Sequence, residues 1–163
     1  MKKKSGTLYI LAGLPGSGKS TYAKEILLKA HPNWYYVSRD EVRYKYVSDQ
    51  KHYFDHEGEV YREFCNQIEM YLLRGETVIA DATHLNEKSR QRLLNTMKTA
   101  PEKLYLVCMT TPFEISFERN SKREGITRVP DDQMYRMKRL FKAPSGIDAL
   151  KYHGVLGVNG SDT

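Results

Sequence analysis

The segment GLPGSGKST, residues 13–21, has the residue types and the spacing to hold phosphate groups. It matches the pattern G-x-x-x-x-G-K-[ST], with Gly13, Gly18, Lys19 and Ser20 in the fixed positions. Glycines let the backbone curl until its N–H groups point to one place, and the helix that follows brings the positive end of its dipole there. The lysine ammonium would reach the β and γ phosphates, and the serine hydroxyl would bind Mg²⁺. The pattern therefore predicts a site for ATP or GTP with Mg²⁺.

The surroundings of this loop favour a nucleotide site over an ordinary strand-to-helix turn. The apolar run TLYILAG leads into the loop, and apolar residues at helical spacing follow it as far as Pro32. This is the context that the pattern requires. We therefore expect the whole loop to contact the nucleotide, including Pro15, Gly16, Ser17 and Thr21 between and beside the fixed positions.

An acid stands at the end of another apolar run, VIAD, residues 78–81. The carboxyl ends of the strands form the ligand-binding edge of an open parallel sheet. Asp81 is therefore predicted to face the metal or the acceptor of a transferred group. The alternative is an Asp that leaves the sheet in a turn or caps the next helix. The phosphate-binding loop in the same chain favours the functional interpretation.

The stretch SRDEVR, residues 38–43, combines a helix start with two charges that share a helix face. Ser38 and Glu41 have the spacing of a capping box, which puts Asp40 in the first turn, where the helix dipole favours an acid. Arg43 is three residues further on and points the same way. An Asp can accept the proton of an attacking hydroxyl, and an Arg can hold a phosphate by two hydrogen bonds. The spacing alone leaves the structural and the functional interpretations evenly balanced.

Basic residues surround a glycine in ERNSKREGITRVP, residues 118–130. In phosphoryl transfer, an arginine of a closing element neutralises charge on the moving group. A solvated basic face is the alternative. Because a small kinase with such a loop needs a closing element, we expect a basic lid over residues 119–130, with Arg119, Lys122, Arg123 and Arg128 in it.

Two further patterns are weaker. His52 and His56 have the spacing of two metal ligands on a helix, but HEGEV lacks the second histidine of H-E-x-x-H, so a metal site is not favoured. Residues 44–64 interleave aromatic and basic side chains, which suits base stacking on single strands. Aromatic residues at helical spacing are more often core, and we favour that interpretation.

The composition suits a single domain over residues 1–163. The chain is 40% hydrophobic with a net charge of +6, a balance that favours polyanionic partners. The apolar run after MKKKSG is too short to cross a membrane and fits a buried strand better than a signal peptide. Cys65 and Cys108 make no disulfide framework, and we expect Cys108 in the core. These features predict a reducing, cytoplasmic location without membrane contact.

Apolar runs alternate with helical segments along the chain, and the runs are apolar on both faces. This predicts an α/β fold with about five parallel strands covered by helices on both faces. In residues 111–123 a capping box is expected at Thr111, with Pro112 as the first helical residue. Strands are expected at residues 7–13, 34–38, 77–81, 103–110 and 154–158, and helices at residues 20–32, 57–75, 86–100, 111–123 and 131–142.

Together these segments resemble the kinase domain of phage-type polynucleotide kinases, within a wider group of small P-loop kinases. The likeness rests on GLPGSGKST, SRDEVR, ADATHLNEKSR and ERNSKREGITRVP, and it runs from about Leu8 to Lys142. It implies a doubly wound P-loop kinase fold that moves the γ-phosphate of ATP to a 5′-hydroxyl end of DNA or RNA. A phage source would also fit the resemblance.

The resemblance also implies roles for single residues. Asp40 would be the general base, Arg43 the clamp on the neighbouring phosphate of the acceptor, and Asp81 an acceptor-side acid. Arg123 would be the lid arginine on the donor phosphates, and Arg119 would line the nucleotide site. Lys19 and Ser20 would keep the roles that the loop gives them.

The sequence departs from the family in DATH, residues 81–84, where the phage enzymes have D-T-N; this affects the acceptor contacts near His84. The chain ends near its last strand, so we expect no 3′-phosphatase activity. Two other functions fit parts of the pattern. Related small kinases phosphorylate sugars, metabolites or a modified base within DNA, and a nucleotide-binding switch would use the loop for conformational change. A switch would leave the base, clamp and lid candidates unexplained.

Overall fold

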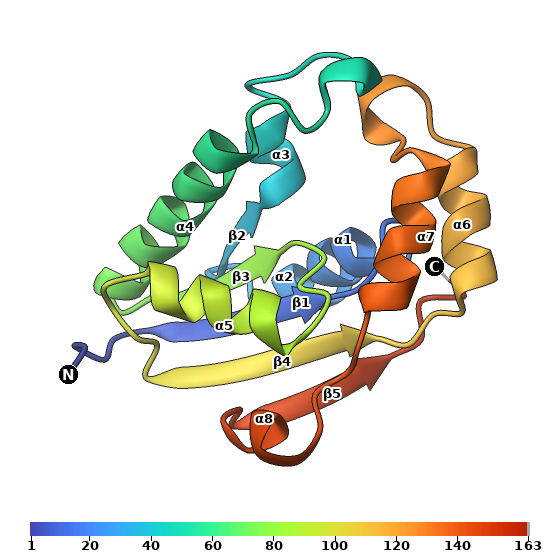
Figure 1. The fold of residues 1–163 in the computed structure, drawn as a ribbon. Helices are drawn as coiled ribbons and strands as arrows, with labels where there is room; N and C mark the ends of the chain where they lie inside the picture. Colours follow the sequence, from blue (N-terminus) through green and yellow to red (C-terminus); the bar gives the residue numbers. More distant parts are fainter. Residues whose placement is uncertain (163) are drawn as a thin grey trace.

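A five-stranded parallel sheet forms the centre of the molecule, in a computed structural model that describes residues 1–162 (Figure 1). All four strand pairs are parallel, and the strand order is β2-β3-β1-β4-β5. The α/β fold and all five expected strands are thereby confirmed. The strands are β1 (Thr7–Ala12), β2 (Tyr35–Ser38), β3 (Thr77–Asp81), β4 (Lys103–Met109) and β5 (Gly154–Val158).

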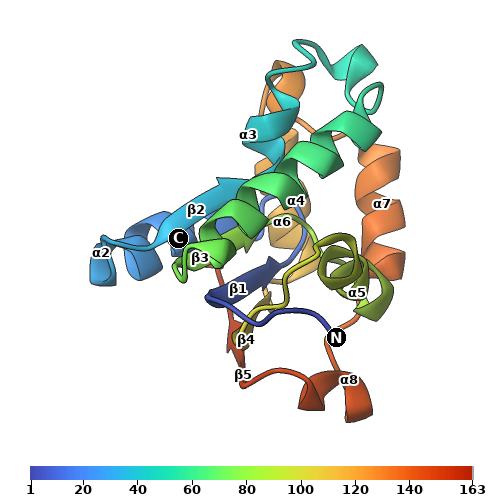
Figure 2. The same cartoon turned by 90° about the vertical axis from the view of Figure 1, so that its left-hand side faces the viewer.

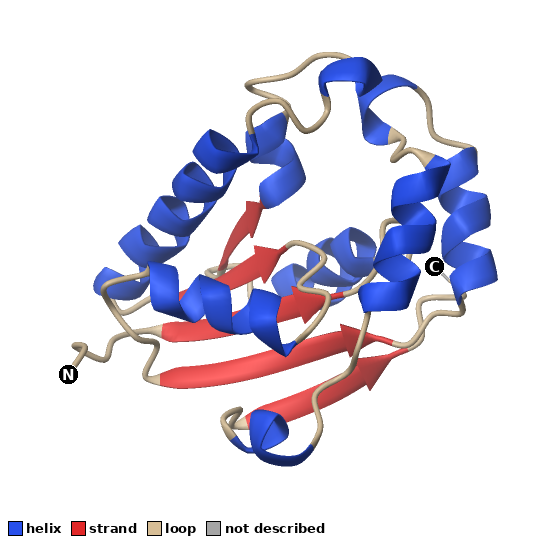
Figure 3. Ribbon diagram, viewed as in Figure 1, coloured by secondary structure: helices blue, strands red, loops and turns tan. Residues whose placement is uncertain are grey.

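Helices cover both faces of this sheet, as Figures 2 and 3 show. One face packs against α4 (Glu57–Leu73) and α5 (Glu87–Thr96), and the other against the helical segment that follows β1. Successive strand residues point to opposite faces, so Ile10 lies in the first core and Leu11 in the second. The segment after β1 consists of α1 (Lys19–Tyr22), a π-helical turn (Ala23–Leu27) and α2 (Leu28–Ala30).

The remaining helices stand around the carboxyl edge of the sheet or at its end. The helix α3 (Arg39–Arg43) follows β2, and α6 (Phe113–Ser121) follows β4 and is joined to α7 (Asp131–Leu140) by a 3₁₀ turn, Gly125–Thr127. A small separate apolar cluster around Met134 joins α6 and α7 to Tyr53 from the loop before α4. The short helix α8 (Gly146–Leu150) was not expected from the sequence.

Two predicted helix starts have different outcomes. At Ser38 the cap is confirmed, because its hydroxyl accepts a hydrogen bond from the Glu41 backbone N–H at 3.2 Å. The capping box at Thr111 was wrong: the helix begins at Phe113, and no side chain caps it. The Thr111 hydroxyl instead donates to the Ser17 carbonyl oxygen at 2.7 Å and accepts from the Gly160 N–H.

The two cysteines, Cys65 and Cys108, are free and buried, which confirms the core position expected for Cys108. Within residues 1–162, no helix has the length and apolar character needed to cross a bilayer.

Candidate active site

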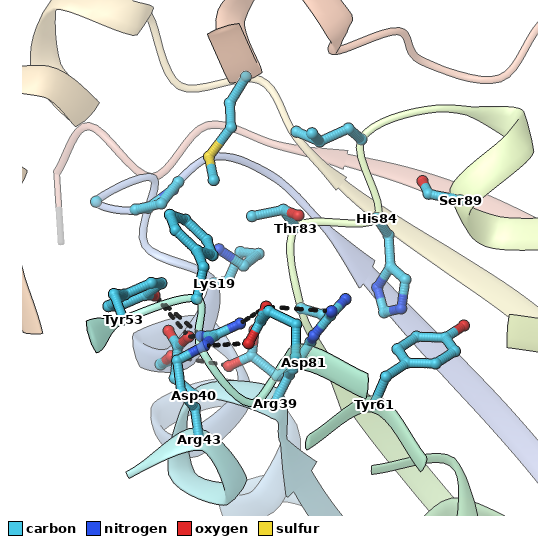
Figure 4. Close-up of a pocket in the computed structure, with 18 of the residues that line it drawn as sticks. Lys19, Arg39, Asp40, Arg43, Tyr53, Tyr61, Asp81, Thr83, His84 and Ser89 are labelled. Atoms are coloured by element: carbon cyan, nitrogen blue, oxygen red, sulfur yellow. Dashed lines mark hydrogen bonds and ion pairs between the residues drawn. The ribbon is translucent and has the colours of Figure 1, made fainter. Parts of the chain in front are cut away.

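The carboxyl ends of β1, β2 and β3 open into a pocket of about 410 Å³. The P-loop forms one wall, and α3 with the start of α4 forms another (Figure 4). The lining also includes residues of β3 and the loop after it, of α5 and of the α6–α7 region. This position agrees with the rule that ligands of open parallel sheets bind at the strand carboxyl ends.

The P-loop presents most of its predicted residues to the pocket. Pro15, Gly16, Gly18, Lys19, Ser20 and Thr21 line it. Gly13 and Ser17 do not; both are buried and shape the loop from behind. A Cβ on Gly13 would lie 2.7 Å from the Ser17 hydroxyl, and one on Gly16 would overlap the Ser116 carbonyl oxygen.

Ser20 and Asp81 meet at the end of β3. The Ser20 hydroxyl donates to Asp81 Oδ2 at 2.8 Å, and the Tyr36 hydroxyl donates to the same oxygen. Burial and the adjacent Asp81 raise the pKa of Tyr36, so this hydroxyl keeps its proton. A serine hydroxyl beside a carboxylate supplies the hard oxygen ligands that Mg²⁺ prefers. The pair therefore fits a Mg²⁺ ion next to the nucleotide phosphates.

Lys19 lines the pocket, and its ammonium donates to the Leu14 carbonyl oxygen at 3.2 Å. Burial lowers the pKa of Lys19, and the negative charges of Asp81 and Asp40 oppose this shift. A bound triphosphate would add negative charge at the same place and hold the ammonium in its charged form.

Asp40 and Arg43 do face each other, as their spacing predicts, and a buried network surrounds them. Arg43 Nη1 donates to Asp40 Oδ1 and, at 2.9 Å, to the Tyr53 hydroxyl. Its Nε and Nη2 donate to the two oxygens of Glu57 at 2.9 and 2.7 Å. The Arg43 side chain is 6% exposed, whereas the Asp40 side chain is 50% exposed. Asp40 is thus the most exposed member of the network.

Glu57 and Tyr53 were not identified from the sequence. Glu57 starts α4 and also receives Arg39 Nη2 at 3.3 Å, so one carboxylate holds two arginines. Burial would lower the pKa of Arg43, but the Glu57 hydrogen bonds and the nearby negative charges raise it above its ordinary value. Arg43 thereby uses four of the five N–H donors of its guanidinium, two for Glu57 and one each for Tyr53 and Asp40, and its role as a phosphate clamp stays a prediction.

A second arginine cluster, also missed from the sequence, lines the pocket next to this network. The guanidinium carbons of Arg39 and Arg92 lie 4.8 and 3.9 Å from the ring centroid of Tyr61. Tyr61 comes from α4 and Arg92 from α5, so only the folded chain brings the three together. We call Arg39, Tyr61 and Arg92 the Tyr61 stack.

The predicted lid segment, residues 119–130, runs from the end of α6 towards α7. Arg123 lines the pocket, and its positive charge contributes to the lowered pKa of Lys19; its role on the donor phosphates stays a prediction. Arg119 lies behind the P-loop, where it donates to the Gly16 carbonyl oxygen at 3.3 Å. Lys122 and Arg128 pair with Glu118 and Asp131 outside the pocket.

His84 occupies the position where the sequence departs from the phage family. It is 5% exposed, has a positive φ of 41°, and its Nδ1 contacts the Leu11 carbonyl oxygen at 2.6 Å. Burial lowers the pKa of His84 to about 4, so the ring is neutral at pH 7 and Nδ1 carries the proton. His84 therefore fixes the loop after β3 to β1.

The two histidines considered as a metal pair each contact a different acid. His52 pairs with Asp49 and His56 with Glu59, each on the surface. Within residues 1–162, no group of three or more His, Cys, Asp or Glu side chains has the arrangement of a metal site.

A family model described as "AAA domain" matches residues 8–144. The chain belongs to this AAA domain family. The match includes the P-loop, the α3 network and the lid segment, and it shows a nucleotide-binding P-loop protein with a kinase-like α/β fold.

One curated relative and two solved structures are also similar to this chain. The chain is 35% identical over 108 residues to 2′,3′-cyclic-nucleotide 3′-phosphodiesterase of Mus musculus; this covers 65% of the chain and 24% of the relative. A chain of a Pnkp1/Rnl/Hen1 complex matches with a TM-score of 0.60 and 26% identity, covering 73% of this chain and 40% of the other. A fungal RNA kinase matches 100% of this chain and 78% of its own, with a TM-score of 0.64 and 11% identity. The chain thus spans about a quarter of the length of the curated relatives that it matches.

Proposed function

We propose that the protein is an ATP-dependent kinase that moves the γ-phosphate to a 5′-hydroxyl end of DNA or RNA. The observation that supports this most is one pocket with a P-loop on one wall and the half-exposed Asp40, held by Arg43, on another. Donor and acceptor chemistry would then meet in the same cavity.

In the proposed reaction Asp40 takes the proton of the 5′-hydroxyl. The hydroxyl oxygen forms a new bond to the γ-phosphorus, the bond between that phosphorus and the β–γ bridging oxygen breaks, and ADP leaves with the electron pair. Positioning and charge neutralisation supply most of such catalysis. Lys19 and Arg123 would neutralise the donor phosphates, and the P-loop N–H groups would hold them.

Mg²⁺ would be held by Ser20, with Asp81 beside it, and would neutralise charge on the phosphates when bound. The acceptor-side role that the resemblance implies for Asp81 also remains a proposal. The hydrogen bond from Ser20 to Asp81 favours the metal side of the site.

The choice of a polynucleotide acceptor rests on three kinds of support. Asp40 and Arg43 match the base and clamp of the phage-type enzymes, the fungal structure is named an RNA kinase, and the 26% identical chain comes from a Pnkp1/Rnl/Hen1 complex. A small hydroxyl metabolite or a modified base in DNA would be the alternative acceptor for the same chemistry. The phosphodiesterase name belongs to a relative of which this chain covers 24%, and it does not account for the P-loop.

Replacement of the base tests this function. Asp40→Asn keeps the size of the side chain and removes its proton affinity, so we expect kcat for transfer to a 5′-hydroxyl oligonucleotide to fall by about 10²-fold or more. ATP binding should stay within about twofold, because Asp40 lies on the acceptor wall. Asp55→Asn, at an exposed position outside the pocket, is the matched control. Wild-type turnover in Asp40→Asn would refute the assignment.

A further inference from the structure

The acceptor side of the pocket contains an arginine, Arg92, that forms no ion pair with the acidic residues around it in the part of the chain that the structure describes. Arg39 and Arg43 share the carboxylates of Asp40 and Glu57, so this network has no net formal charge. Arg92 lines the same pocket from α5, and no carboxylate in residues 1–162 forms an ion pair with it. An unpaired guanidinium in a pocket for phosphorylated ligands can take up a phosphate without breaking an existing ion pair.

The Tyr61 stack fixes where this free charge lies. Tyr61 is 7% exposed and cannot swing away, and the Arg92 guanidinium carbon is 3.9 Å from its ring centroid. A guanidinium that stacks on a ring by its face keeps its N–H edges free for hydrogen bonds. The contact therefore holds the Arg92 charge against the Tyr61 ring, and the N–H fork of a guanidinium can donate two parallel hydrogen bonds to one phosphate.

The same stack connects Arg92 to the proposed base. Arg39 is the residue before Asp40, and its guanidinium contacts the Tyr61 ring at 4.8 Å. Figure 4 shows Arg39, Asp40 and Tyr61 on the same side of the pocket. An acceptor whose 5′-hydroxyl lies at Asp40 would thus be led along this wall, from the start of α3 past Tyr61 towards α5.

We infer that Arg92, stacked on Tyr61, binds the second phosphate of a polynucleotide acceptor, counted from its 5′-hydroxyl end. The inference rests on the proposed function and narrows it. The first phosphate lies one nucleotide from the hydroxyl and belongs next to Asp40 and Arg43. The second lies one nucleotide further along the wall, where Arg92 stands. The acceptor class is then an oligonucleotide with at least two phosphates, and a nucleoside monophosphate or a small metabolite uses only part of the site.

Two acceptors that differ by one nucleotide test this assignment. We would measure kcat/KM for a nucleoside 3′-monophosphate and for the corresponding dinucleotide 3′-phosphate, in the ribo and deoxy series. The wild-type protein should prefer the two-phosphate acceptor by about tenfold, as expected for one charged contact. Arg92→Met keeps an unbranched stem and removes the charge, so it should lose most of this preference. Arg62→Met, at an exposed position of α4 outside the pocket, should keep it.

The outcomes separate this inference from the function on which it rests. If the wild-type protein shows no preference, or if Arg92→Met loses activity equally on both acceptors, the second-phosphate assignment is overturned and the 5′-kinase stands. If neither acceptor is phosphorylated, the proposed function fails, and the Arg92 site is then tested by measuring oligonucleotide binding. The probe is then a 5′-hydroxyl hexanucleotide with a 3′ dye, titrated by anisotropy at several salt concentrations. Arg92→Met should lower the slope of log K against log salt by about 0.7 to 0.9, and an unchanged slope overturns the inference.

Discussion

The carboxylate of Glu57 should contribute more to stability than any surface ion pair, because it holds a buried guanidinium. Glu57→Gln keeps the volume of the side chain and removes its charge. Its partner Arg43 is 6% exposed and donates two of its hydrogen bonds to this one group, at 2.9 and 2.7 Å. Removing one partner of a buried pair costs about 3–5 kcal/mol. Asp40 remains as a partner, Gln can still accept one bond, and Glu57 is 27% exposed, so we expect about 2 kcal/mol.

Urea unfolding measures this loss. With a slope of about 2 kcal/mol per M for a chain of this size, the midpoint should fall by about 1 M. Glu63→Gln is the control on the same helix, because Glu63 pairs with Lys45, whose side chain is 59% exposed, and such a pair is worth at most about 1 kcal/mol. In a double-mutant cycle, Glu57→Gln should cost much less once Arg43 is replaced by Met. A Glu57 effect no larger than that of Glu63, or full additivity with Arg43→Met, would refute this account of the network.

Two further predictions follow from single residues. The pKa of His84 is about 4 in the folded protein and near 6.5 in an unfolded chain, so the unfolded state binds more protons between these pH values. The free energy of unfolding should therefore fall by up to about 3 kcal/mol as the pH drops from 6.5 to 4. A series of urea midpoints measured at different pH values should show this fall, and His84→Asn should flatten it. Gly16→Ala should weaken ATP binding at least tenfold and lower the thermal midpoint, because Gly16 has a φ of 83° and the new Cβ would overlap the Ser116 carbonyl oxygen. The control Gly58→Ala, in open space on α4, should be neutral or stabilising. Equal ATP affinity in both variants would contradict the role given to the loop backbone.

The parts of the site that lie close together in the sequence could be predicted from it. The P-loop is one continuous motif, and Asp40 and Arg43 are three residues apart on one helical turn, so local geometry alone brings them face to face. The five strands were evident as apolar runs because both faces of the sheet are covered.

The parts of the site that depend on tertiary packing could not be predicted. Glu57, Tyr61 and Arg92 belong to ordinary amphipathic helices, and their spacing carries no sign that they would face one pocket. The cap expected at Thr111 was wrong because the Ser17 carbonyl and the Gly160 N–H, both distant in sequence, bind its hydroxyl instead. Local rules do not include such partners.

The central claim is that the pocket joins a nucleotide donor to a 5′-hydroxyl acceptor. The most direct test is transfer from γ-labelled ATP, with Mg²⁺, to a short 5′-hydroxyl oligonucleotide, with the same oligonucleotide already 5′-phosphorylated as the control. The account predicts label on the first and none on the second. Label on neither, in a preparation that binds ATP, would contradict the claim and would assign the Asp40 wall to a different acceptor.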